Sequence, residues 1–302
     1  MELRLRNGVL LKYEGAQVMG IINVTPDSFF EGSRCQGEEN LRKRVRQIIE
    51  EGGTMIDLGA YSTRPDADEV SAEEELSRLA FALPIIIDEL NIQKFRNSEI
   101  QKDGSVSYIP VSVDTFRAEV AKECILKYGA DIINDVSGGT LDEDMLLVVA
   151  ETKAPYILMH MRGTPKTMQS MTDYPDGVTN EVMKFFRKQI ERLHEISFSL
   201  DPEDEDASLP IILDPGFGFA KTIEQNYQLF SNLPAFKYSF KEYPLLVGIS
   251  RKSMIYKLLE TDAEHALNGT SVLNALAVAS GADILRVHDV KEAVAVVKQM
   301  KK

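Results

Sequence analysis

The stretch PIILDPGFGF, residues 210–219, raises the question on which the interpretation of this chain depends. Its first half is an apolar run typical of a buried strand, and the run stops at a carboxylate, Asp214, followed by a proline and two glycines. The next helical pattern begins only near Thr222. Asp214 is therefore too far from that helix to cap it, and a ligand is the better explanation for a charge at the end of a core strand.

Seven other short apolar runs alternate with helical patterns along the chain. Each run is apolar throughout rather than alternating, which fits a strand of a parallel sheet covered on both faces. Eight strand–helix units predict a (β/α)8 barrel, the TIM barrel, and the alternative is a doubly wound open sheet. The predicted strands are residues 17–22, 54–59, 109–114, 130–135, 155–160, 210–215, 244–250 and 282–288.

The rest of the chain fits around such a barrel, and we expect residues 1–302 to form a single domain. The opening segment, LRLRNGVLLKYEG, alternates in character around an Asn-Gly pair, which predicts a β-hairpin that caps the barrel floor. Two polar inserts, residues 91–108 and 198–209, each follow a helix and precede a strand. Loops that lead from a helix into the next strand lie at the floor of the barrel, away from the catalytic face, so we interpret both as solvated loops. Residues 23–40 form a long loop before the first helix, on the functional face.

Composition excludes several classes of protein. The net charge of −13 argues against a general nucleic-acid binder, which needs a basic face. No apolar run approaches the length of a membrane helix, and the N-terminus lacks the apolar segment of a signal peptide. Cys35 and Cys124 stand far apart, which predicts free thiols in a reducing compartment and hence a cytoplasmic protein.

Polar residues stand at or just after the end of every predicted strand. In a barrel these ends converge on one face, so residues far apart in sequence would share one site. Asp114, Asn134 and Asp214, with Lys252, suit a flat, nitrogen-rich heterocycle, because carboxylates accept from ring N–H groups while Lys and Asn bind carbonyl and ring nitrogens. Each residue also has a simpler interpretation: a strand-end Asp is often a turn or cap residue, and Asn134 could bond neighbouring backbone.

A second group of strand-end residues suits a polyanion such as pyrophosphate. It consists of Asn23, Arg64, Arg286 and His288. Arg64 can pair two phosphate oxygens at once, although taken alone it could equally be a flexible surface arginine. Asn23 and Asp27 supply only oxygen ligands, which favours Mg2+ over zinc.

Two further residues remain open between structure and function. Ser253 could simply cap the helix that follows it, and such a cap would also offer free amides to a carboxylate. His160 could be a core histidine whose hydrogen bonds are satisfied within the protein.

Eight segments, taken together and in order, resemble the dihydropteroate synthase family, pterin-binding enzymes of folate biosynthesis. The resemblance runs from about residue 17 to 290 and touches all eight strand ends. The segments are MGIINVTPDSF, STRP, SVDTF, INDVSGG, LMHMRGTPKTMQ, ILDPGFGF, GISRKSM and LRVHDV.

The resemblance implies a (β/α)8 barrel that joins 6-hydroxymethyl-7,8-dihydropterin pyrophosphate to 4-aminobenzoate, giving 7,8-dihydropteroate and pyrophosphate. It implies Mg2+ as cofactor, small-molecule substrates, and a homodimer packed through late barrel helices. By motif position, Asp114, Asn134, Asp214 and Lys252 would hold the pterin, and Arg286 and His288 the pyrophosphate, with Arg64 closing over it.

The same comparison assigns the second substrate and the metal. Asn23, with Asp27, would bind Mg2+. Among these residues we take Arg64, Asp114 and Lys252 as catalytic. The 4-aminobenzoate pocket would be formed by Thr63, Pro65, Phe219 and Ser253, with Phe29 and Pro65 shutting the loops over it.

This chain departs from the commoner family pattern in two places. It reads GAYSTRP where many members read GGESTRP, so Ala60 and Tyr61 are variants, and it carries Arg162 where some members have Gln. Both changes lie beside the expected site, so they bear on inhibitor sensitivity rather than on the reaction.

An SN1-like reaction is expected, because the chain offers an abundant anion site and no obvious general-base pair. Two rival functions use the same fold. A corrinoid-linked methyltransferase would have no use for the SRKS, RVH and STRP segments as an anion site. A non-catalytic pterin-binding barrel predicts a missing pyrophosphate or metal residue, and none is missing from the motifs.

Overall fold

The computed structural model describes residues 1–24, 34–61, 70–93, 95–100, 106–202 and 209–301. Eight parallel strands run side by side in the order β10-β9-β8-β7-β4-β3-β12-β11. A parallel bridge between Leu213 and Leu245 joins the two ends of this order, so the sheet closes into a barrel rather than staying open. The strands are β3 (Gln17–Asn23), β4 (Met55–Gly59), β7 (Val111–Asp114), β8 (Ile132–Asp135), β9 (Tyr156–Met159), β10 (Ile211–Asp214), β11 (Leu246–Val247) and β12 (Ile284–Val287).

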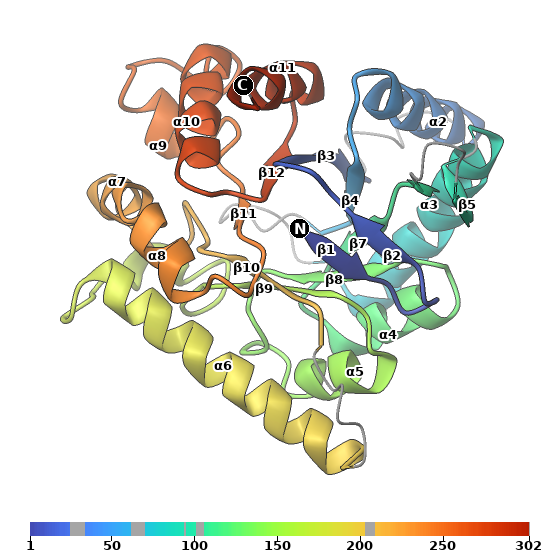
Figure 1. Cartoon of the computed structure of the whole chain (residues 1–302), viewed down its shortest axis with the longest axis horizontal. Coiled ribbons are helices and arrows are strands. Elements are labelled where there is room, and N and C mark those ends of the chain that lie inside the picture. The colour runs from blue at the N-terminus through green and yellow to red at the C-terminus, as the bar shows by residue number, and fades with distance from the viewer. Residues whose placement is uncertain (25–33, 62–69, 94, 101–105, 203–208, 302) are drawn as a thin grey trace.

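Helices surround the strands and confirm the predicted (β/α)8 architecture (Figure 1). The last helix covers the stretch VKEAVAVVKQM. The helix after β10 begins as expected at an N-cap, Thr222, which exchanges hydrogen bonds with Gln225 in a capping box. The helices are α2 (Arg34–Glu50), α3 (Ala72–Ile92), α4 (Ala118–Leu126), α5 (Met145–Thr152), α6 (Val178–Leu200), α7 (Ile223–Ser231), α8 (Leu233–Ser239), α9 (Ser253–Tyr256), α10 (Leu267–Ala279) and α11 (Val290–Met300).

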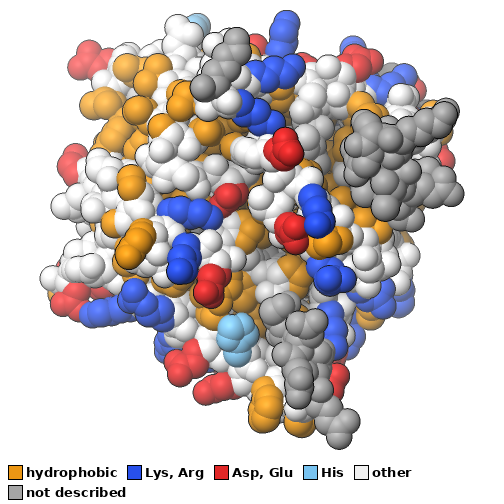
Figure 2. Space-filling view, viewed as in Figure 1, with side chains coloured by type: hydrophobic (Ala, Val, Ile, Leu, Met, Phe, Trp, Pro, Cys, Tyr) orange, Lys and Arg blue, Asp and Glu red, His pale blue; other side chains and the backbone are white. Residues whose placement is uncertain are grey.

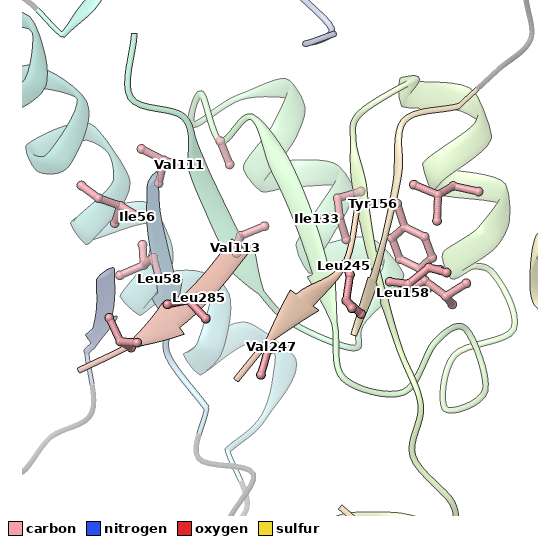
Figure 3. Packing of buried hydrophobic residues seen from close by; sticks show 14 of the residues in the cluster. Ile56, Leu58, Val111, Val113, Ile133, Tyr156, Leu158, Leu245, Val247 and Leu285 are labelled. Carbon is pink, nitrogen blue, oxygen red and sulfur yellow. The ribbon is translucent and has the colours of Figure 1, made fainter. Parts of the chain in front are cut away.

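The outward-facing side chains of the strands pack against these helices and form the larger core. Figure 3 shows them on neighbouring strands, including Ile56 and Leu58 of β4, Val111 and Val113 of β7, and Leu158 of β9. All five are fully buried. Burial of one such side chain stabilises the fold by about 1.5–3 kcal/mol, so the strands are fixed from outside the barrel.

Inside the barrel, the lowest layer of side chains is apolar and is closed by the N-terminal hairpin. Strands β1 (Glu2–Arg4) and β2 (Leu10–Lys12) pair antiparallel, and the turn between them uses Gly8 at φ +86°. The hairpin lies across the middle of the helix ring in Figure 1. This confirms the predicted cap on the floor, because Leu3, Leu5 and Leu11 join the buried cluster formed by Met19, Met55, Ile132, Ile157, Ile212, Leu246 and Ile284.

Two expectations about loops are wrong. Helix α2 begins at Arg34, so the predicted loop over residues 23–40 is shorter than the sequence suggests. The polar insert over residues 91–108 contains an antiparallel pair, β5 (Arg96–Ile100) and β6 (Val106–Tyr108), rather than loop alone. Tertiary contacts explain this pair, because Arg96 donates to Asp131 and stacks over the Tyr108 ring at 4.5 Å.

Candidate active site

The layer of side chains above the apolar barrel floor is polar. Successive side chains of a strand alternate between the two faces, so a residue two positions beyond an inward apolar residue also points into the barrel. Met55, Ile132, Ile212 and Ile284 belong to the floor cluster. The residues two positions after them are Asp57, Asn134, Asp214 and Arg286.

Arg286 lies at the centre of this layer and joins two carboxylates from different strands. Its Nε donates to Asp57 Oδ2 at 2.5 Å, and its Nη2 donates to Asp114 Oδ2 at 2.6 Å. Burial lowers the pKa of the guanidinium, but the charges of Asp57 and Asp114 outweigh that effect and leave it raised. Arg286 is therefore a permanent cation at the C-terminal end of the barrel.

Asp114 ends β7, and opposing effects act on the pKa of its carboxyl group. Burial raises its pKa to about 7; the charge of Arg286 lowers it, and the carboxylates of Asp57, Glu75 and Asp135 raise it further. The side chain is only 13% exposed, so water does little to screen these charges. A carboxyl group that titrates near neutrality can change its hydrogen-bonding role within the physiological pH range.

The DPGFGF segment shows why a carboxylate and two glycines stand together. Asp214 Oδ1 accepts a hydrogen bond of 2.8 Å from the Gly216 N–H, so the strand end and the turn fix each other. Gly216 has φ +73°, and a Cβ there would lie 2.0 Å from the His160 carbonyl oxygen. Only glycine fits this position. Burial raises the pKa of Asp214, against the charge of Lys252 and the Gly216 hydrogen bond.

Lys252 reaches over this turn from the segment between β11 and α9. Its Nζ donates to the Phe217 carbonyl oxygen at 2.5 Å and lies 4.7 Å from the centre of the Phe219 ring. Burial lowers its pKa to about 8, although the charges of Asp214 and Asp114 raise it. Phe219 packs on the edge of a small apolar cluster that includes Met159, so one wall of the site is apolar.

His288 and Ser253 stand further out on the same rim. The His288 N–H donates to Ser250 Oγ at 3.2 Å, and burial together with the charge of Arg286 lowers the pKa of the imidazole to about 4. Ser253 is the first residue of α9, and Lys252 occupies the N-cap position without a side-chain capping bond. The simple interpretation of Ser253 as a helix cap is therefore wrong.

Asn23 ends β3 on the exposed side of the polar layer. Its Oδ1 lies 3.2 Å from where a Cβ on Gly59 would be, and Asp114 Oδ2 lies 3.9 Å from the same point. An amide oxygen beside a carboxylate fits Mg2+, which takes one or two protein oxygens and completes its shell with water and substrate phosphates. Among the residues described, no three His, Cys, Asp or Glu side chains gather into a metal cluster.

The structure brings together Asn23, Asp114, Asn134, Asp214, Phe219, Lys252, Ser253, Arg286 and His288 at the C-terminal ends of the strands, as the sequence predicts. The remaining predicted site residues, Asp27, Phe29, Thr63, Arg64 and Pro65, lie outside the described residues.

Comparison with known proteins decides the family. The model of the family described as "Pterin binding enzyme" matches residues 19–288, which is most of the chain. The chain belongs to the pterin-binding enzyme family.

Individual members of the family resemble the chain over almost its full length. A dihydropteroate synthase of Synechocystis is 42% identical over 275 residues, covering 91% of this chain and 85% of the relative. A solved dihydropteroate synthase of Xanthomonas albilineans with 4-aminobenzoic acid has a TM-score of 0.81 at 32% identity and covers 100% of this chain and 98% of its own. The same enzyme in complex with 7,8-dihydropteroate has a TM-score of 0.78 at 29% identity, covering 100% and 98%.

Two residues that support this pterin-binding site escaped the sequence analysis. Asp57 lies within the apolar run of β4, and a carboxylate in such a run is the signal that could have found it. Lys221 is buried and donates to the Gly216 and Phe219 carbonyls at 2.9 and 3.0 Å; it also lies 3.0 Å from His160 Nδ1. His160 is thus a core residue held by the protein itself, as one of its two interpretations had it.

The two variant segments also have structural partners. Tyr61 packs edge-on against Phe116, with ring centres 5.4 Å apart, and the Arg117 guanidinium lies 5.3 Å from the Tyr61 ring. Arg162 pairs with Glu181 and stacks 4.0 Å over the Tyr174 ring.

Proposed function

We propose that this chain condenses 6-hydroxymethyl-7,8-dihydropterin pyrophosphate with 4-aminobenzoate to give 7,8-dihydropteroate and pyrophosphate. The observation that carries the proposal is the polar layer of Asp57, Asp114, Asn134, Asp214 and Arg286, with Lys252 above it, inside a pterin-binding barrel. Solved relatives hold 4-aminobenzoic acid and 7,8-dihydropteroate, a substrate and the product of this reaction.

The pterin ring is recognised by the buried acceptors of the layer. Asp214 and Asp114 accept from the ring N–H and amino groups, and Asn134 meets a further ring edge. Lys252 donates to the ring carbonyl or a ring nitrogen. These groups are desolvated, so each hydrogen bond discriminates strongly against ligands without the matching edge.

The anion side of the site holds the pyrophosphate. Arg286 is permanently charged, and His288 stands two residues further along the chain at the rim. By motif position Arg64, outside the described residues, would add a second guanidinium. Asn23 would hold Mg2+ together with Asp27, which lies outside the described residues; bound Mg2+ would neutralise phosphate charge and make pyrophosphate a better leaving group.

Bond breaking precedes bond making. The C–O bond between the exocyclic methylene and the pyrophosphate breaks, and the electron pair leaves with the pyrophosphate. The methylene cation is delocalised into the pterin, and the negative field of Asp114 stabilises it. The arylamine nitrogen then forms the new C–N bond and its proton goes to solvent, so no protein nucleophile is used.

4-Aminobenzoate occupies the outer, partly apolar side of the site. Phe219 offers a ring face beside Lys252, and Ser253 stands next along the chain with a hydroxyl for the carboxylate. By motif position Thr63, Pro65 and Phe29 would also serve this substrate; all three lie outside the described residues.

The chain works as a homodimer in the cytoplasm. Figure 2 shows apolar side chains gathered at the upper left, over α9 and α10. Large side chains exposed on α10 or just after α9 are Leu258, Leu259, Val272 and Leu276, and a large exposed apolar patch is typical of a protein interface. Over the described part of the chain, no helix has the length and hydropathy needed to cross a membrane.

Turnover tests the reaction directly. The full chain is mixed with pterin pyrophosphate, 4-aminobenzoate and Mg2+, and dihydropteroate is followed. Product formation is expected; a folded protein that binds pterin and gives no product overturns the proposal.

For the order of steps, pterin pyrophosphate with heavy oxygen in the bridging position is incubated without 4-aminobenzoate. Scrambling of the label supports cleavage before attack, and its absence in an active enzyme overturns that order.

A further inference from the structure

Asp57 is a buried carboxylate to which the proposed reaction assigns no direct role. It lies in the middle of β4 and is 1% exposed. Its Oδ2 accepts from Arg286 Nε at 2.5 Å and from Asn134 Nδ2 at 3.2 Å. Its Oδ1 accepts from the same Asn134 nitrogen at 3.2 Å and from Ser112 Oγ. Both oxygens are thus occupied by protein donors from three other strands, and neither is free for a substrate.

The contact with Asn134 fixes which end of that amide faces the ligand. An ionised carboxylate only accepts hydrogen bonds, so the amide nitrogen must face Asp57 and the oxygen must point away. In the described part of the chain, Asn134 Oδ1 has no hydrogen-bond partner. It is an acceptor whose direction Asp57 determines.

The contact with Arg286 fixes the plane of the guanidinium. Two of its nitrogens are held by carboxylates on neighbouring strands, β4 and β7. A guanidinium is a rigid planar fork, so these two bonds also set the direction of the third nitrogen, Nη1. Nη1 has no hydrogen-bond partner within the described residues, which leaves its donors for an anion.

We infer that Asp57 is a positioning residue that orients the Asn134 amide oxygen toward the pterin and the free Arg286 nitrogen toward the pyrophosphate. This inference rests on the proposed function. Asp57 then links the recognition of the two halves of one substrate. Its carboxylate holds both Asn134, which meets the pterin, and Arg286, which meets the pyrophosphate. Asp57 itself does not touch the substrate.

The first test replaces Asp57 by the isosteric amide. Asn at this position can donate as well as accept, so Asn134 is no longer forced into one orientation and Arg286 loses a charged partner. We expect D57N to lower kcat/KM for pterin pyrophosphate by about 10- to 100-fold, with the KM for 4-aminobenzoate changed less than about threefold. The matched control is Ser112→Ala, which removes another hydrogen bond to Asp57 and should change kcat/KM by less than about threefold.

A second variant separates positioning from structure. The swap D57N/N134D restores a carboxylate–amide pair but reverses which partner faces the ligand. If the swap binds pterin as tightly as the wild type, the orientation of the pair does not matter and the positioning role fails. A positioning role predicts recovered thermal stability with pterin affinity still reduced by about 10-fold or more. If D57N alone does not fold, the D57N/N134D swap still allows the role of Asp57 to be tested.

The outcomes are distinguishable from failure of the proposed function. A wild-type chain that forms no dihydropteroate contradicts the reaction itself. An active wild type with a D57N variant of equal kcat/KM, or a swap that binds pterin like the wild type, overturns the role of Asp57 alone.

Discussion

Arg286 and Asp114 are joined by a hydrogen bond of 2.6 Å between Nη2 and Oδ2, across two strands that are not neighbours in the barrel. The residue proposed to hold the pyrophosphate is therefore paired with a residue proposed to hold the pterin. Because the pair is largely buried, a change of charge on either partner is felt by the other.

The first prediction concerns the pH dependence of pterin binding. The pKa of Asp114 is raised to about 7, so below that pH the group is protonated and no longer accepts two hydrogen bonds as a carboxylate. Affinity for 6-hydroxymethylpterin, which carries no pyrophosphate, should fall by up to about tenfold for each pH unit below this value. Asp114→Asn should bind weakly at all these pH values. Isothermal titration calorimetry measures both.

The charged groups facing Asp114 allow an independent check. They are Arg286 on β12, Asp57 on β4, Glu75 on α3 and Asp135 on β8. Removing the positive charge with Arg286→Met should raise the pKa of Asp114 further and move the decline in affinity to higher pH. Affinity that stays constant through pH 7 in the wild type would contradict the role of Asp114 as a carboxylate acceptor.

The second prediction concerns the turn after β10. Gly216→Ala puts a methyl group 2.0 Å from the His160 carbonyl at a φ of +73°, so both backbone strain and overpacking result. We expect a loss of about 3–5 kcal/mol in the free energy of unfolding, measured by urea denaturation. The control is Gly177→Ala, at φ +83° with no atom within 4 Å of the new Cβ. With ψ at 142° this backbone is itself unfavourable for alanine, so the substitution should cost only that strain, about 1–3 kcal/mol; equal losses at the two positions would refute the close contact.

The third prediction concerns Arg251, between Ser250 and Lys252. Its backbone is left-handed, at φ +55°, and its guanidinium makes two hydrogen bonds of 2.8 Å to Asp289. These two hydrogen bonds join the segment after β11 to the segment after β12. Arg251→Lys keeps the charge but loses the fork, so we expect a loss of about 1–3 kcal/mol and a raised KM for pterin pyrophosphate.

Lys122→Gln is the control for this ion pair. It removes an exposed pair with Glu151 and should change the free energy of unfolding by less than about 1 kcal/mol. Chemical denaturation and steady-state kinetics measure both variants. Arg251→Lys with wild-type stability and KM would show that the fork is dispensable.

The barrel and the rim of the site could be predicted from the sequence because both leave local signals. Apolar runs that end in a polar residue mark buried strands opening onto one face, and Asp114, Asp214 and Arg286 are all found that way. The start of the helix after Asp214 could be located because its capping box lies within four consecutive residues.

The second layer of the site could not be predicted in the same way. Asp57 stands inside an apolar run, and its partners Ser112, Asn134 and Arg286 are remote in sequence, so its role depends on which residues face inward. The insert over residues 91–108 fails for the same reason. Its polar composition suggests a loop, whereas contacts of Arg96 and Tyr108 with Asp131 on the barrel wall support the paired strands.

The last prediction concerns the proposed homodimer. Leu276 on α10 is 50% exposed and belongs to the apolar patch on α9 and α10, so a charge there opposes association without disturbing the core. Leu276→Asp should sediment as a monomer at concentrations where the wild type is a dimer, with its thermal unfolding otherwise cooperative. Phe198→Asp is the control, because Phe198 is 66% exposed but lies near the far end of α6, and it should stay dimeric. Analytical ultracentrifugation distinguishes the cases: a monomeric wild type refutes the dimer, and a dimer lost only on Phe198→Asp moves the interface to α6.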